Sequence, residues 1–178
     1  MRATILAAGA LLLGATAPAA AQTAAPLGSA HLAGTFQLAG RVTVAVHIRG
    51  ERAGQTATRL WSFKSLCTTG QCRVVVLRRD RAHGTDKVVL FRKGPAYYRG
   101  TASFYAPLRC GGRVYRRGAK VPFTIKVWVT TAQLDPSGND VAVRVRATYT
   151  NRKRINMTPC VAFLGHDAAR YHGHIVPT

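Results

Sequence analysis

Three segments of the chain alternate apolar and polar residues with a period of two. They cover residues 42–48, 121–130 and 141–149. In the second segment, one face carries Val121, Phe123, Ile125, Val127 and Val129, and the other face carries Thr124, Lys126, Trp128 and Thr130. Successive side chains of a strand point to opposite faces, whereas a helix would scatter these apolar residues around its circumference. The pattern therefore predicts antiparallel strands with one buried and one solvated face.

Less regular apolar segments, separated by turn-forming residues, fill much of the remaining sequence. They cover residues 59–66, 73–77, 87–91 and 97–105. Gly and Asp-rich sequences separate them, and Gly111-Gly112 is placed to form a two-residue hairpin turn. Because the connections are short, consecutive strands should pair as an antiparallel meander of roughly eight or nine strands. We predict an all-β fold that forms a closed or nearly closed barrel, with a two-sheet β-sandwich as the alternative.

The C-terminal segment interrupts the alternation. Small apolar residues over 159–171 give no period-two pattern. We expect this segment to form one short helical turn that covers a barrel end or a sheet edge.

The N-terminal residues differ in composition from the rest of the chain. Arg2 gives a short positive start, residues 5–13 are apolar, and residues 19–21 are all alanine. These are the features of a secretory signal peptide. No later apolar segment reaches the about 20 residues that a membrane-spanning helix requires. We predict a secreted or extracytoplasmic protein, with cell-envelope association as an option and no transmembrane segment in the mature chain.

The same reasoning divides the chain into three parts. We predict a signal peptide over residues 1–21, a flexible lead-in over residues 22–33 and a single β domain over residues 34–178. The lead-in is assigned because its residues are small and weakly patterned.

The chain contains four cysteines, all after the predicted signal peptide. An even number in an oxidising compartment favours two disulfides. Cys67 and Cys72 flank a short loop between two predicted strands, so their backbones should lie close together. Cys110 and Cys160 are then left as partners. We predict the pairs Cys67–Cys72 and Cys110–Cys160, because the spacing lacks the paired ligands of a structural zinc site.

The charge of the chain is strongly positive. The chain contains twenty-six Lys and Arg residues but only six Asp and Glu residues, which gives a formal net charge of +20. Such a surface attracts polyanions, and guanidinium groups suit phosphate, sulfate and carboxylate oxygens. We predict binding of an anionic extracellular polymer or surface, with a solvated basic surface as the alternative. The candidate residues are Arg113, Arg116, Arg117, Lys120, Arg144, Arg146, Arg152, Lys153 and Arg154.

A barrel interior offers a second candidate function, which is carriage of a small apolar ligand. Aromatic side chains would line its cavity, unless they simply fill the barrel as core. The candidates are Trp61, Phe63, Phe91, Tyr98, Phe104, Phe123 and Trp128.

An enzyme is the third candidate, and the sequence favours a binding protein over it. No serine lies in a nucleophile elbow, and the predicted disulfides leave no free thiol. His166, His172 and His174 are candidate metal ligands, since the last two would share one side of an extended chain. We interpret these histidines as solvated and predict no metal and no cofactor.

Overall fold

The computed structural model describes residues 24–81, 84–162 and 164–177, so the predicted signal peptide lies outside the described residues. Within these ranges the chain forms strands and no helix. The strands are β1 (Gly34–Val46), β2 (Thr56–Ser65), β3 (Val74–Arg81), β4 (Gly84–Gly94), β5 (Tyr97–Cys110), β6 (Arg113–Leu134), β7 (Asp140–Asn151), β8 (Ile155–Asn156) and β9 (His166–Val176).

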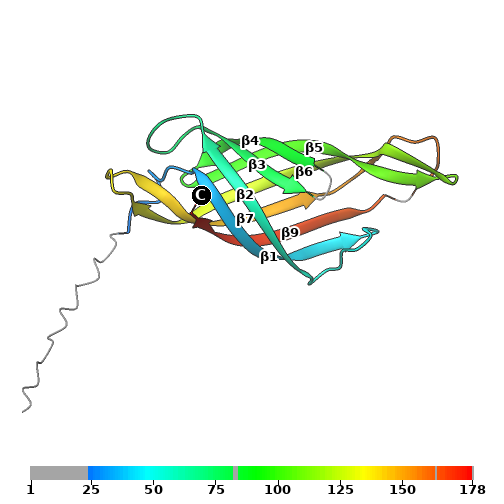
Figure 1. Cartoon of the computed structure of the whole chain (residues 1–178), viewed down its shortest axis with the longest axis horizontal. Helices are drawn as coiled ribbons and strands as arrows, with labels where there is room; N and C mark the ends of the chain where they lie inside the picture. Colours follow the sequence, from blue (N-terminus) through cyan, green and yellow to red (C-terminus); the bar gives the residue numbers. More distant parts are fainter. Residues whose placement is uncertain (1–23, 82–83, 163, 178) are drawn as a thin grey trace, which may run out of the picture.

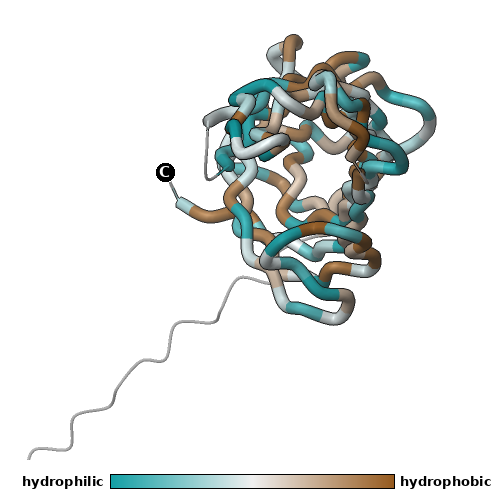
Figure 2. Tube along the Cα trace, turned by 90° about the vertical axis from the view of Figure 1, so that its right-hand side faces the viewer, coloured by the Kyte–Doolittle hydropathy of each residue, from teal (hydrophilic) through white to brown (hydrophobic). Residues whose placement is uncertain are grey.

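Eight of these strands form a closed antiparallel barrel, and the short β8 is added beside β6. Strands that are consecutive in the chain lie next to each other from β1 to β7, and β9 pairs with both β7 and β1. Figure 1 shows the strands running along the long axis, and Figure 2 shows the ring that they form around it. The predicted meander barrel is confirmed, and the two-sheet alternative is wrong because the sheet closes on itself.

The C-terminal segment forms no helical turn in its described residues: 166–171 belong to β9, and 159–162 and 164–165 have no regular secondary structure, while residue 163 lies outside the described residues. Residues of β9 pair with β1 from Thr35↔Val176 to Val46↔His166. The other edge of β9 pairs with β7 over most of its length. The expectation was wrong because pairing on both edges, and not local sequence preference, sets the conformation of this segment.

Inward-facing side chains divide the barrel interior into two halves. At one end the core is apolar and aromatic, with Phe36 and Phe63 in edge-to-face contact at 5.4 Å between ring centroids. Trp61 lies between this cluster and Tyr171 on β9, at 5.7 Å from the Tyr171 ring. At the other end, where β3 finishes and β9 begins, charged side chains point inward. The barrel therefore has a packed apolar half and a charged half.

The segment before β1 covers the apolar end of the barrel. Ala30 and Leu32 are fully buried within the main core cluster. The backbone N–H of His31 donates to the Asp140 carbonyl oxygen at 2.7 Å, and Ala142 N–H donates back to His31 at 3.0 Å. Part of the segment over residues 22–33 thus packs against the barrel, while the domain limits stay a prediction.

Two disulfides and one tight turn follow the predicted pattern. Cys67–Cys72 closes the loop between β2 and β3, with Cα atoms 5.6 Å apart. Cys110–Cys160 joins the end of β5 to the connection between β8 and β9, with Cα atoms 6.0 Å apart. Gly111 and Gly112 have φ values of 55° and 74° between the paired residues Cys110 and Arg113. Positive φ at both central residues is what a two-residue hairpin turn requires, so glycine fits there.

Removing the long-range disulfide should destabilise the protein more than removing the short-range one. The pairs are separated by 50 and 5 residues. Loop entropy gives about 4 kcal/mol for the first and about 2 kcal/mol for the second. Urea unfolding of Cys110→Ala/Cys160→Ala and Cys67→Ala/Cys72→Ala measures both losses. An equal or reversed ranking would contradict the loop-entropy argument.

Gly40 lies where the backbone of β1 approaches its paired strand β9 too closely to leave room for a side chain. A Cβ atom at Gly40 would overlap the carbonyl oxygen of Arg170 on β9. Gly40→Ala should therefore push the strands apart and lower the free energy of unfolding by about 1–3 kcal/mol. Gly94→Ala is the control, since a Cβ there meets nothing within 4 Å. Chemical denaturation compares the two variants, and equal stability would show that β9 can shift without cost.

Candidate functional sites: a basic groove and a charged cavity

The outer face of β5, β6 and β7 carries a hollow of about 650 Å³ in which positive charges gather. We call it the basic groove. Its polar lining consists of five cations, Arg99, Lys120, Lys126, Arg152 and Lys153, and four hydroxyl groups, those of Thr101, Ser103, Thr124 and Thr150. Among the residues that the structure describes, no Asp or Glu lines it. The groove thus presents hydrogen-bond donors and positive charge without a compensating anion.

Strand alternation and register build this groove. Arg99 on β5 lies directly opposite Lys126 on β6, and Thr101 lies opposite Thr124, which faces Thr150 on β7. Residues two apart along each strand share the outer face, so each strand adds a cation or a hydroxyl to the same surface. Like charges placed directly opposite each other destabilise a sheet. Repulsion between Arg99 and Lys126 is therefore expected to lower the free energy of unfolding, and a bound anion would reduce this repulsion.

A row of stacked side chains borders the groove. Tyr97 on β5 stacks on Trp128 of β6, with ring centroids 5.0 Å apart and planes 16° apart. The Arg146 guanidinium on β7 lies 4.9 Å from the Trp128 ring centroid. Stacking of this kind holds the Arg146 guanidinium in place beside the groove.

The structure distributes the sequence-predicted cations over four places. Lys120, Arg152 and Lys153 line the groove. The exposed Arg144 and Arg146 follow it along β7, whereas the exposed Arg113, Arg116 and Arg117 lie on the far end of the β5–β6 hairpin. Arg154 instead lies in the barrel interior, where it pairs with Asp167. The groove cations Arg99 and Lys126 are not among these nine candidates, although the alternation of residues 121–130 already places Lys126 on the polar face.

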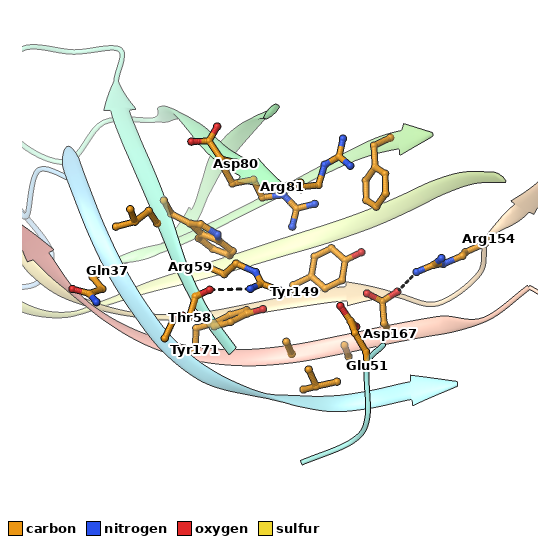
Figure 3. A pocket seen from close by; sticks show the side chains of 17 residues that line it. Gln37, Glu51, Thr58, Arg59, Asp80, Arg81, Tyr149, Arg154, Asp167 and Tyr171 are labelled. Atoms are coloured by element: carbon orange, nitrogen blue, oxygen red, sulfur yellow. Dashed lines mark hydrogen bonds and ion pairs between the residues drawn. The ribbon is translucent and has the colours of Figure 1, made fainter. Parts of the chain in front are cut away.

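The charged half of the barrel encloses a second hollow, of about 840 Å³. We call it the charged cavity. Figure 3 shows Arg59, Arg81, Tyr149, Asp167 and Tyr171 lying around it. Strands β1, β2, β3, β5, β7 and β9 all contribute side chains to the wall. Arginines and carboxylates alternate with aromatic rings in this lining, so the cavity is amphipathic.

One wall of the cavity is a buried ion-pair cluster. Arg79 Nε and Nη2 donate to Asp86 Oδ2 at 3.0 and 2.8 Å. Arg81 Nε lies 2.8 Å from the same oxygen. The Arg79 guanidinium lies 4.1 Å from the Phe123 ring centroid, and that of Arg81 lies 4.0 Å from the Phe104 centroid. The carboxylate and the aromatic rings together fix both guanidinium groups against the wall.

Another part of the wall holds the Asp167 and Glu51 carboxylates. Arg154 Nη2 donates to Asp167 Oδ1 at 3.0 Å. Burial, and the nearby Asp167 carboxylate, raise the pKa of Glu51 above its ordinary value, against the opposing effect of Arg59 and Arg154. Burial also raises the pKa of the Tyr149 hydroxyl, and Asp167 raises it further. Both effects oppose a negative charge on the Glu51 carboxyl group and on the Tyr149 hydroxyl group themselves.

The cavity reaches solvent between β2 and β3. The register between these strands ends at Trp61↔Arg79, so residues 56–60 of β2 pair only with β1. Inward-facing Arg59 and Arg81 and outward-facing Thr58 and Asp80 line the same hollow. Because side chains from the inner and the outer face of β2 and β3 line the same hollow, this hollow passes through the barrel wall between the two strands. We call this passage the lateral opening.

The aromatic residues considered for an apolar ligand site are separated. Trp61 and Phe104 line the cavity, whereas Phe63, Tyr98 and Phe123 are buried core residues. Phe91 is half exposed, and Trp128 lies on the outer face beside the groove.

The candidate metal ligands are not brought together either. His172 and His174 are exposed on β9, and His166 begins that strand. Among the described residues, one group has metal-ligand geometry, formed by His31, Cys67 and Cys72. Its two sulfur atoms are joined in a disulfide, so neither offers a thiolate.

Comparisons with known proteins give no match: no family model, no curated protein and no solved structure resembles the chain significantly. In the part of the chain that the structure describes, no helix has the length and hydrophobicity needed to cross a membrane.

The buried Asp86 should matter far more for stability than the exposed Asp80. Asp86→Asn leaves two guanidinium groups in the barrel interior without their anion, which costs about 3–5 kcal/mol for a buried pair. Asp80 lies 3.9 Å from Arg78 with both side chains exposed, so Asp80→Asn should change stability by less than about 1 kcal/mol. Urea unfolding compares the variants. Similar small losses in both would mean that water reaches Arg79 and Arg81 freely.

Proposed function

We propose that this protein is secreted and binds an anionic extracellular polymer or surface through the basic groove. The observation that carries the proposal is the groove lining, with five cations and four hydroxyl groups and no carboxylate. Guanidinium, ammonium and hydroxyl groups all donate hydrogen bonds to phosphate, sulfate or carboxylate oxygens. The lining is therefore complementary to an oxyanion in charge and in hydrogen bonding.

The placement of the six carboxylates supports the same proposal. Glu51, Asp86 and Asp167 are directed to the charged cavity and its ion pairs. Asp135 accepts hydrogen bonds from the backbone N–H groups of Ser137 and Asn139 in the turn between β6 and β7, and Asp140, at the start of β7, accepts one from Ser29 Oγ. Asp80 is exposed on β3, beside Arg78. The outer face of β5, β6 and β7 is left with an unbalanced positive potential. Such a field concentrates anionic partners and speeds their encounter.

A polymer fits this surface better than a single small anion. The groove cations come from β5, β6 and the connection that follows β7. Neighbouring strands lie about 4.8 Å apart, and residues two apart on one strand are separated by about 7 Å. Arg144 and Arg146 extend the positive surface along β7 beyond the groove. Several oxyanions in a row would be needed to meet these cations together.

Extracellular location is supported by two features. The N-terminal residues have the composition of a signal peptide, and all four cysteines form disulfides, which persist in oxidising compartments. Anionic polymers that a secreted protein meets include wall polymers, acidic polysaccharides and extracellular DNA.

Binding to a panel of fluorescent anionic polymers across a salt series tests the proposal. Affinity should fall steeply with salt, because bound cations release counterions from the polymer. Arg99→Gln/Lys126→Gln/Arg152→Gln should weaken binding by about tenfold or more and reduce the salt slope by about one per lost contact. The panel consists of polyphosphate, dextran sulfate, polyglutamate and DNA.

The matched control removes the same charge elsewhere. Lys64→Gln/Arg73→Gln/Lys87→Gln changes three exposed cations that do not line the groove. It should lower affinity only slightly. Equal losses in the two triple variants would reduce the groove to one part of a general basic surface and overturn the proposal.

A further inference from the structure

The charged cavity lies in a barrel of a size that commonly holds one small ligand. Eight-stranded barrels have an interior that is either filled by side chains or just wide enough for one small molecule. In this protein, the apolar half is filled, and the charged half together with the lateral opening holds a hollow of about 840 Å³. That volume lies within the range of small-molecule sites. The lateral opening gives a ligand access without passage through the packed half.

Arg59 is the cavity arginine whose guanidinium is not held in an ion pair with a described carboxylate. Its Nη1 donates to the backbone oxygen of Thr58 at 2.8 Å. Among the described residues, no carboxylate lies within ion-pair distance of it, whereas Arg79, Arg81 and Arg154 each have one. In Figure 3 the Arg59 side chain extends toward Tyr149, across the hollow. A guanidinium of this kind leaves most of its N–H donors for a ligand.

A second donor is also left over in the lining. Arg154 Nε is buried and has no hydrogen-bond partner, although its Nη2 is held by Asp167. Arg79, Arg81 and Arg154 are paired with Asp86 and Asp167, and the Asp80 carboxylate at the outer side of the hollow lies beside Arg78. The Arg59 guanidinium and Arg154 Nε therefore remain as hydrogen-bond donors to an incoming anion.

The rest of the lining is suited to an apolar body. Trp61 is on the same face of β2 as Arg59, two residues further along. Its ring lies 5.7 Å from that of Tyr171, and Phe104 lines the cavity from β5. An aromatic floor with a guanidinium at the entrance is complementary to an amphipathic molecule.

We propose that the charged cavity binds a small amphipathic carboxylate. The carboxylate pairs with the fork of the Arg59 guanidinium at the lateral opening. The apolar part lies inside the barrel against Trp61, Phe104 and Tyr171. A purely apolar ligand would leave the arginines and carboxylates of the lining desolvated without new partners, which is costly. This site is separate from the basic groove and does not depend on it.

Calorimetric titration of the purified protein with decanoate and with decanol tests the proposal. The two probes share an apolar chain and differ in the charge of the head group. Decanoate should bind at least about tenfold more tightly than decanol, since only the carboxylate forms the charge-assisted hydrogen bonds. Equal affinities, or no decanoate binding, would overturn the proposal.

Three variants locate the site. Arg59→Gln should weaken decanoate binding by about tenfold and leave decanol binding nearly unchanged. Arg73→Gln removes the same charge before β3, at the apolar end of the barrel, and should leave both affinities unchanged. Ala169→Leu places a larger side chain in the cavity wall and should reduce the binding of both probes. Circular dichroism checks that each variant keeps the β fold.

Two outcomes distinguish cavity binding from general electrostatic attraction. If Arg73→Gln weakened decanoate binding as much as Arg59→Gln does, decanoate would be assigned to the basic surface and the proposal would be overturned. Unchanged decanoate binding in Ala169→Leu would place the probe outside the cavity and also overturn it. Polymer binding is measured on the same wild-type sample, so that a failure of the groove proposal is seen separately.

Discussion

Closure of the sheet by β9 is the constraint on which the rest of the structure depends. Its two edges pair with β1 and β7, so the backbone groups at both ends of the meander find partners. A row of unpaired backbone groups would otherwise remain on β1 and on β7, two valine-rich strands, and would promote association with other chains. The closed ring also creates an interior. Both candidate sites follow from this, one inside the ring and one on its outer surface.

The two sites are linked through the limited supply of carboxylates. Arg79 and Arg81 point into the barrel and require Asp86 to offset the cost of burying them. Asp167 does the same for Arg154. Carboxylates held inside cannot neutralise cations outside, so the charge of the outer face is partly a consequence of the polar interior. The aromatic rings of Phe104 and Phe123 add contacts that keep the interior guanidinium groups in place.

Much of the fold could be predicted from the sequence because strand alternation and turn chemistry are local signals. The barrel, both disulfides and the Gly111-Gly112 hairpin follow from them. β9 could not be predicted, since its Ala, Gly and His residues have weak strand preference and its conformation is set by two neighbouring strands. The burial of Leu32 likewise depends on a barrel end that the local sequence does not reveal.

The candidate sites were predictable to a smaller degree. In β3, Val75 and Leu77 point inward, and the same period continues to Arg79 and Arg81, so a charged interior could have been inferred. The position of Arg154 could not, because it depends on how the chain after β7 folds back toward Asp167. The opposition of Arg99 and Lys126 depends on the register between β5 and β6, which composition does not encode.

The lateral opening has a consequence for rates of exchange. The strands that border it, β2 and β3, share no ladder hydrogen bonds beyond Trp61↔Arg79. A molecule leaving the interior there would need the exposed Arg59 side chain to change rotamer, but no strand to separate. Rotamer changes of exposed side chains take picoseconds to nanoseconds, far less time than local unfolding. The barrel could therefore exchange its contents many times within the lifetime of a single folded molecule.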